Sequence, residues 1–93
     1  MVTNKEVKTI AADGVVSNSP CLLFSVHLTG GSDAATAILY DNASAASGSV
    51  MMKREAAATD STDANLGGVF CVNGLYADVS GTAPSLTVVF KRL

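Results

Sequence analysis

Apolar and polar residues alternate in short runs along this chain, and clusters of Gly, Ser, Asn and Asp separate the runs. Alternation with a period of two is typical of β-strands that bury one face, and turn clusters at intervals of roughly 8 to 12 residues are typical of sandwiches. The chain shows no long helical period and no internal repeat. The pattern predicts an all-β fold: a small antiparallel β-sandwich of six to eight strands, jelly-roll-like or immunoglobulin-like in topology.

Four segments carry the clearest strand pattern, namely residues 5–12, 21–29, 35–40 and 85–92. Successive side chains of a strand point to opposite faces, so every second residue of a half-buried strand faces the core. In 85–92 this rule assigns Leu86, Val88 and Phe90 to one face. In 21–29 the wholly apolar set is predicted to face the core, and it comprises Leu22, Phe24, Val26 and Leu28.

The middle of the chain is less regular. Residues 43–48 are small and polar and are predicted to form a loop, while 50–53 have strand character that continues into a stretch of good helix formers, too short to be a helix without packing. Residues 59–65 carry no large apolar side chain and are predicted to be a solvated loop. Residues 69–79 regain strand character around Asn73-Gly74, which indicates either a hairpin turn or a bulge in one long strand.

Length and charge limit the classes of function. Ninety-three residues allow one domain, 1–93, with a thin core, and 48% hydrophobic content with 15% charged residues excludes disorder. A net charge of −2 disfavours a nucleic-acid partner. No apolar run reaches a membrane span or a secretory signal, so we expect synthesis in a cytoplasm and no membrane partner. So little charge on so small a chain indicates surface that is covered in an assembly.

The cysteines and the single histidine offer little chemistry. Cys21 and Cys71 lie 50 positions apart, a spacing that fits an immunoglobulin disulfide, but the chain has no Trp and has Val69 where a tyrosine corner needs Tyr. We therefore expect free thiols. His27 lies on the polar side of its predicted strand, roughly 20 Å from Cys21 at 3.3 Å per residue, too far for a thiol–imidazole pair. Only an unpredicted strand pairing would bring Cys71 to it.

No other cluster points to catalysis or to a cofactor. A metal centre needs about four ligands, and the chain has one His. Residues 60–65 hold three acidic or amide side chains but lack the alternating acidic pattern of a calcium loop. We expect a protein that is not an enzyme and holds no cofactor or metal.

The C-terminal third of the chain carries a resemblance. Residues 74–90 read GLYADVSGTAPSLTVVF, and this stretch resembles small structural proteins of tailed bacteriophages, in which a GLY-type strand and a GT turn precede a final LTV-type strand. Residues 37–42, AILYDN, are similar to the same group's middle strand, and residues 21–31 fit its early strand. The resemblance implies a virion head decoration (cement) protein that sits as a trimer or dimer on the major capsid protein. It transfers no catalytic residue.

Contact residues follow from the remaining motifs. The basic pair Lys53-Arg54 is either ordinary charge at a strand edge or a contact with an acidic partner, and one of the two preceding methionines should point outward. Residues 1–8 are either part of the first strand or an extended arm that adds to a neighbour's sheet. The candidate capsid or subunit contacts are therefore Val2, Lys5, Met51, Met52, Lys53 and Arg54.

Two other functions remain open. One is a binding module on a tail, fibre or host-recognition device of the virion, although Tyr40 and Tyr76 are the only large aromatic residues that could form a sugar platform. The other is a small thiol-dependent enzyme that uses His27. The discriminating observations are head binding, glycan binding and the effect of replacing His27.

Overall fold

Eight strands make up the fold in the computed structural model, which describes residues 5–93 and shows no helix among them. Every connection between successive strands contains Gly, Ser, Asn, Asp or Pro. In chain order the strands are β1 (Glu6–Ile10), β2 (Gly14–Ser17), β3 (Cys21–Thr29), β4 (Ala35–Tyr40), β5 (Val50–Ala56), β6 (Ser61–Cys71), β7 (Leu75–Ser80) and β8 (Ser85–Arg92). The predicted all-β class is confirmed.

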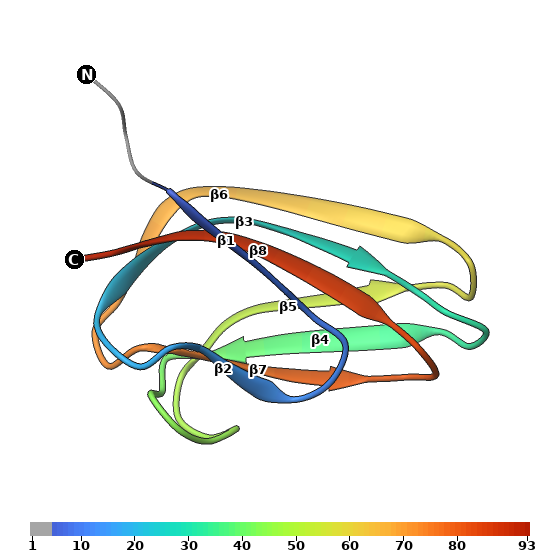
Figure 1. Cartoon of the computed structure of the whole chain (residues 1–93), viewed down its shortest axis with the longest axis horizontal. Coiled ribbons are helices and arrows are strands. Elements are labelled where there is room, and N and C mark those ends of the chain that lie inside the picture. The colour runs from blue at the N-terminus through green and yellow to red at the C-terminus, as the bar shows by residue number, and fades with distance from the viewer. Residues whose placement is uncertain (1–4) are drawn as a thin grey trace.

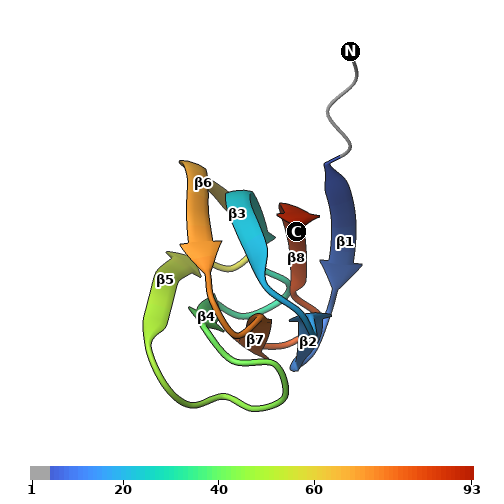
Figure 2. The same ribbon diagram turned by 90° about the vertical axis from the view of Figure 1, so that its left-hand side faces the viewer.

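The strands form two antiparallel four-stranded sheets packed face to face, as a β-sandwich (Figure 1). Sheet A has the order β1-β8-β3-β6, and sheet B has the order β2-β7-β4-β5. Seen from the side, the two layers stack so that β6 lies above β5 and β1 lies above β2 (Figure 2). The predicted small antiparallel β-sandwich is confirmed.

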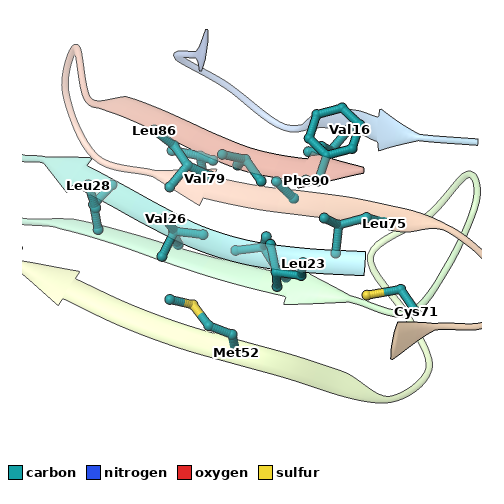
Figure 3. Close-up of a cluster of buried hydrophobic side chains, with 14 of the residues drawn as sticks. Val16, Leu23, Val26, Leu28, Met52, Cys71, Leu75, Val79, Leu86 and Phe90 are labelled. Carbon is teal, nitrogen blue, oxygen red and sulfur yellow. The ribbon is translucent and has the colours of Figure 1, made fainter. Parts of the chain in front are cut away.

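The core lies between the sheets, and the two sheets fill it differently. Sheet A contributes large side chains, among them Leu23, Leu86 and Phe90 (Figure 3). The inner positions of sheet B include several alanines, all 5% exposed or less: Ala35, Ala37, Ala56 and Ala77. Large residues facing small ones let the two sheets interdigitate at the density of a close-packed core.

The face of β3 was predicted only in part. Val26 and Leu28 are buried as expected, and so are Leu86, Val88 and Phe90 of β8, but at the start of β3 it is Cys21 and Leu23 that point inward. A β-bulge between Leu23 and Ser25 inserts Phe24 and exchanges the two faces of the strand. Leu22 and Phe24 therefore lie on the outer face of sheet A, and the prediction that they face the core is wrong.

Residues 61–71 form β6, the longest strand, so the predicted loop at 59–65 is wrong from Ser61 onward. β6 is an edge strand with a solvated outer face, and its small inward residues gave no strong apolar signal. The stretch of helix formers after Lys53 continues β5 to Ala56 instead of forming a helix. Asn73-Gly74 joins β6 of sheet A to β7 of sheet B, and is neither a hairpin turn within one sheet nor a bulge in one strand.

β1 pairs with β8 of the same chain over its full length, from Glu6 opposite Phe90 to Ile10 opposite Leu86. The Arg92 guanidinium, 2.6 Å from a carboxylate oxygen of Glu6, fastens this edge and holds the pKa of Glu6 below its usual range. Residues 6–8 thus belong to β1, an edge strand paired with β8 on one side, and the alternative of an extended arm over residues 1–8 stays a prediction. Residues 1–4 lie outside the described part of the chain.

Candidate functional site

The outer face of sheet A carries apolar side chains from all four strands, and Ser25 and Lys91 stand beside them in the register. Strand register places Val7 opposite Val89, and Leu22 opposite Phe70. Val7 is 65% exposed and Phe70 is 50% exposed, so this surface is open to solvent. We call the five residues of this surface the sheet A face; they are Val7, Leu22, Phe24, Phe70 and Val89.

The β-bulge hollows this face. Phe24 has no register partner, and three residues of β6 (Leu66, Gly67 and Gly68) stand opposite it. Gly67 and Gly68 adopt positive φ values of 69° and 100°, which favour glycine. A Cβ on Gly68 would lie 3.3 Å from the Phe24 ring, so the missing side chain makes room for the aromatic group.

A groove of about 610 Å³ opens beside Phe24 on this face. The Lys5 ammonium lies 4.4 Å from the centre of the Phe24 ring, an attractive cation–π geometry. Polar side chains of the groove come from the neighbouring strands and include His27, Asp63, Asn65 and Thr87. The site thus combines an apolar floor with a polar margin, which is the make-up of a binding surface.

His27 lies across the ladder from Asp63, and Nδ1 of the imidazole contacts a carboxylate oxygen of Asp63. The two side chains are 49% and 74% exposed, so they form a solvated surface contact and not a buried dyad. The Thr87 hydroxyl, on the other side of His27, pairs with the Thr9 hydroxyl at 3.1 Å. Within residues 5–93 no hydroxyl or thiol is hydrogen-bonded to the imidazole.

The two cysteines do not line this groove, because their side chains point to the other side of sheet A. Both thiols are free, fully buried and on the inner side of sheet A, whereas His27 is on its outer side. In the pairing of β3 with β6, Cys71 stands opposite Cys21, and Asp63 stands opposite His27. The hypothesis of a cysteine–histidine enzyme is therefore not supported by this arrangement. In the part of the chain that the structure describes, no three His, Cys, Asp or Glu side chains are grouped to hold a metal.

The residues of the predicted contact set do not share one surface. Met52 is 8% exposed and belongs to the core, and Met51 is half-buried against it. Arg54 points the opposite way from Lys53 and donates hydrogen bonds to β6, at 2.7 Å to the Thr62 hydroxyl and 2.9 Å to the Asp63 carbonyl. Met52 and Arg54 are therefore occupied within the chain and are removed from the contact set.

The remaining members differ in position. Lys53 is exposed on the outer side of β5, with its ammonium 3.6 Å from Glu55. Lys5 joins the sheet A face through Phe24. Val2 lies outside the described residues. The predicted set thus contributes Lys5 to the candidate site, and the apolar residues of that site were not among the predicted contacts.

The outer face of sheet B carries the two tyrosines of the chain. Tyr40 of β4 and Tyr76 of β7 are direct register partners, flanked by Val50 and Val15 on the outer strands of the sheet. The tyrosines are 36 positions apart in sequence, so only the topology brings them together. We call these four residues the tyrosine row.

Two carboxylates lie near the tyrosine row. Asp13 accepts a hydrogen bond of 2.8 Å from the backbone N–H of Val79, which holds its carboxylate beside β7. Desolvation, followed by the neighbouring Asp13 side chain, raises the pKa of Asp78. This pair lies on the outer side of sheet B, opposite the candidate groove.

Residues 5–93 contain no helix that could span a membrane. No family model, curated protein or solved structure matches this chain.

Proposed function

We propose that this chain is a head decoration (cement) protein of a tailed bacteriophage, made in the bacterial cytoplasm and bound to the outside of the assembled capsid. The observation that carries the proposal is the sheet A face, a set of apolar side chains on the outer side of all four strands, of which Val7 and Phe70 are at least half exposed, in a protein with only 15% charged residues. Its partner in this role is the major capsid protein.

The composition of the sheet A face suits an interface. Interfaces are depleted of charge at their centre and polar at their rim, with aromatic residues enriched. Phe24 and Phe70 supply the aromatic groups of this face, and Lys5, His27 and Asp63 lie around them. Burial of apolar surface against the capsid stabilises the complex by about 25 cal/mol per Å² before the cost of association.

The size of the face favours several copies acting together. The whole outer surface of sheet A, four strands about 4.8 Å apart and roughly eight residues long, has a flat area of about 500 Å², and the sheet A face is part of it; both are below the roughly 800 Å² per partner of a standard interface. A dimer or trimer of this chain would engage two or three capsid sites at once, and the linked binding events raise the total affinity. Self-association on the head is therefore part of the proposal.

The mechanism of stabilisation is mass action. A ligand that binds the assembled lattice but not free subunits stabilises the lattice by RT ln(1 + [L]/Kd) for each site. At a concentration one hundred times Kd this amounts to about 2.7 kcal/mol per site. The chain needs no catalytic residue for this role, only a rigid surface and a repeated partner.

Co-sedimentation with undecorated, expanded phage heads tests the proposal. The wild-type chain is expected to pellet with heads at micromolar concentration. Phe70→Asp places a charge in the sheet A face and should weaken head binding at least tenfold, as expected at an interface anchor. Val50→Asp is the matched control, because Val50 is 55% exposed but lies on sheet B.

Failure of the wild-type chain to co-sediment would contradict the proposal, and so would equal binding by Phe70→Asp. Thermal unfolding of both variants establishes that each is folded. Light scattering of the free chain at several concentrations separates a preformed dimer or trimer from one that assembles only on the head.

The tyrosine row favours a second candidate, a host-recognition module on the tail or a fibre. Adjacent aromatic side chains on an exposed sheet can stack against a sugar ring, and Tyr40 and Tyr76 are direct cross-strand neighbours. This candidate predicts binding on a glycan array that is lost in Tyr76→Ala. Glycan binding without head binding would replace the decoration function by this one.

A further inference from the structure

The two cysteines of the chain are direct neighbours in the fold. Cys21 begins β3 and Cys71 ends β6, and the two are register partners at the end of the antiparallel ladder of sheet A. Both are 0% exposed, and both thiols are free. Figure 3 shows the Cys71 sulfur directed into the buried cluster between the sheets.

The backbone spacing of such a pair suits a covalent bond. Directly opposed residues of antiparallel strands have Cα atoms about 4.5 to 5.5 Å apart. A disulfide spans Cα separations of about 4.4 to 6.8 Å, so opposed residues of a ladder lie within the range that the bond requires. The thiols already influence each other, because the Cys21 side chain is the first cause, before burial, that raises the pKa of Cys71.

We propose that Cys21 and Cys71 are a disulfide-forming pair, which a low-molecular-weight disulfide such as oxidised glutathione converts to a bond within the chain. The thiolate of one cysteine attacks a sulfur of oxidised glutathione, breaking its S–S bond and releasing one glutathione. The thiolate of the second cysteine attacks the mixed disulfide and releases the other glutathione. The two protons lost by the cysteines are taken up by the two glutathione thiolates, and two electrons pass to the oxidant.

The alternatives for this pair are weaker. A packing role needs two small apolar side chains but no particular register between them, whereas the only two cysteines of the chain lie directly opposite each other. A metal site would need further ligands, and no group of three suitable side chains is present within residues 5–93. His27 lies on the other side of the sheet.

The bond would close a long loop. It joins β3 and β6 of sheet A at positions 50 residues apart. The covalent ring that it closes contains β4 and β5, which are two of the four strands of sheet B. Closing a loop of this length removes much of the conformational freedom of the unfolded chain. The oxidised protein should therefore unfold at a temperature at least about 10 °C above that of the reduced protein.

Burial makes the reaction slow in the folded protein. Neither thiol is exposed, so a small disulfide reaches the pair only when the end of β6 separates from β3. Oxidation of native protein should accelerate when low concentrations of urea promote this opening. Oxidation during refolding bypasses the barrier.

The experiment refolds the full chain from urea in a buffer of oxidised and reduced glutathione and measures its intact mass and its thiols. The expected product has lost the mass of two hydrogen atoms, carries no glutathione, reacts with no thiol reagent in denaturant and shows the higher unfolding temperature. The control Cys71→Ala cannot form the bond within the chain and should refold with the single thiol of Cys21 intact.

A refolded, soluble chain that keeps two thiols, or that carries glutathione on each cysteine, would overturn the inference. So would a disulfide that joins two chains, which a non-reducing gel detects. An oxidised monomer whose unfolding temperature is no higher than that of the reduced protein would contradict the predicted stabilisation. The inference does not depend on the decoration function, because no capsid enters the experiment.

Discussion

Arg54 ties the open edges of the two sheets together. Its guanidinium reaches from β5 of sheet B to the Thr62 hydroxyl and the Asp63 carbonyl of β6 in sheet A. Its Nε atom is buried, with no hydrogen-bond partner among residues 5–93. Because the Arg54 guanidinium is hydrogen-bonded to β6, Lys53 and Arg54 do not form a basic patch on the surface, although they are adjacent in the sequence.

Replacing Arg54 tests this assignment. Arg54→Met keeps much of the side-chain length but removes two charge-assisted hydrogen bonds, and should lower the free energy of unfolding by about 1 to 2 kcal/mol. Urea unfolding measures the loss. Lys53→Met is the matched control, because Lys53 is exposed and its change should stay within about 0.5 kcal/mol. Equal losses in the two variants would contradict the role of Arg54.

Asp78 gives the stability of the chain a defined pH dependence. Its raised pKa means that the folded protein favours the protonated carboxyl, so the stability gained from this group is full at low pH and lost as pH rises through the raised pKa. At pH 7 the Asp78 and Asp13 carboxylates repel each other. Because Asp78 lies near the surface, solvent screening limits the repulsion.

Asp78→Asn removes this repulsion and should raise the unfolding temperature at pH 7 by about 2 to 4 °C, or about 0.5 kcal/mol. Thermal unfolding from pH 7 to pH 3 should show the difference shrinking as the wild-type Asp78 becomes protonated. Glu55→Gln removes one negative charge elsewhere, beside Lys53, and should show no such gain. A pH-independent effect of Asp78→Asn would contradict the explanation.

Among the elements, β3 shows what the sequence pattern can and cannot predict. Alternation predicted its bounds, Cys21–Thr29, and the inward position of Val26 and Leu28. It could not predict the bulge, because the bulge depends on three residues of β6 standing opposite Phe24, with positive φ at Gly67 and Gly68. The alternation of apolar and polar residues within one strand contains no information about the strand that pairs with it.

The residues of the candidate site could not be predicted from the sequence for the same reason. The sheet A face combines Val7, Leu22 and Phe70 from three strands, and the tyrosine row combines residues from all four strands of sheet B. Register alone creates these neighbours, and a single sequence does not contain register. β6 itself carried a weaker signal, since its inward residues Thr62, Ala64 and Leu66 alternate with exposed ones.

The turn after β3 requires glycine because another turn packs against it. A Cβ on Gly31 would lie 1.9 Å from the carbonyl oxygen of Thr82, in the turn between β7 and β8. Gly31→Ala should therefore destabilise the chain by about 2 kcal/mol or more, since the backbone must shift. Gly14 is the matched control: a Cβ there meets nothing within 4 Å, so Gly14→Ala should stabilise by about 0.4 to 1 kcal/mol. Urea unfolding compares them, and similar effects would contradict the close approach.

At the scale of the whole molecule, the hydrophobic content divides into two parts. One part is buried between the sheets, where alanines of sheet B face larger side chains of sheet A in a close-packed core. The other part lies outside, on the sheet A face and the tyrosine row. The scarcity of charge is thus a property of the surface, and a protein held against a lattice needs fewer charges to stay in solution.

The central claim is that the sheet A face binds a capsid. The most direct measurement is a density map, at a resolution that separates strands, of undecorated heads incubated with this chain. We predict sandwich-shaped density on the outer capsid surface, with β3 and β6 of sheet A, and Phe70 with them, against the major capsid protein. Heads without added density, or a sandwich that faces the capsid with the tyrosine row, would contradict the account.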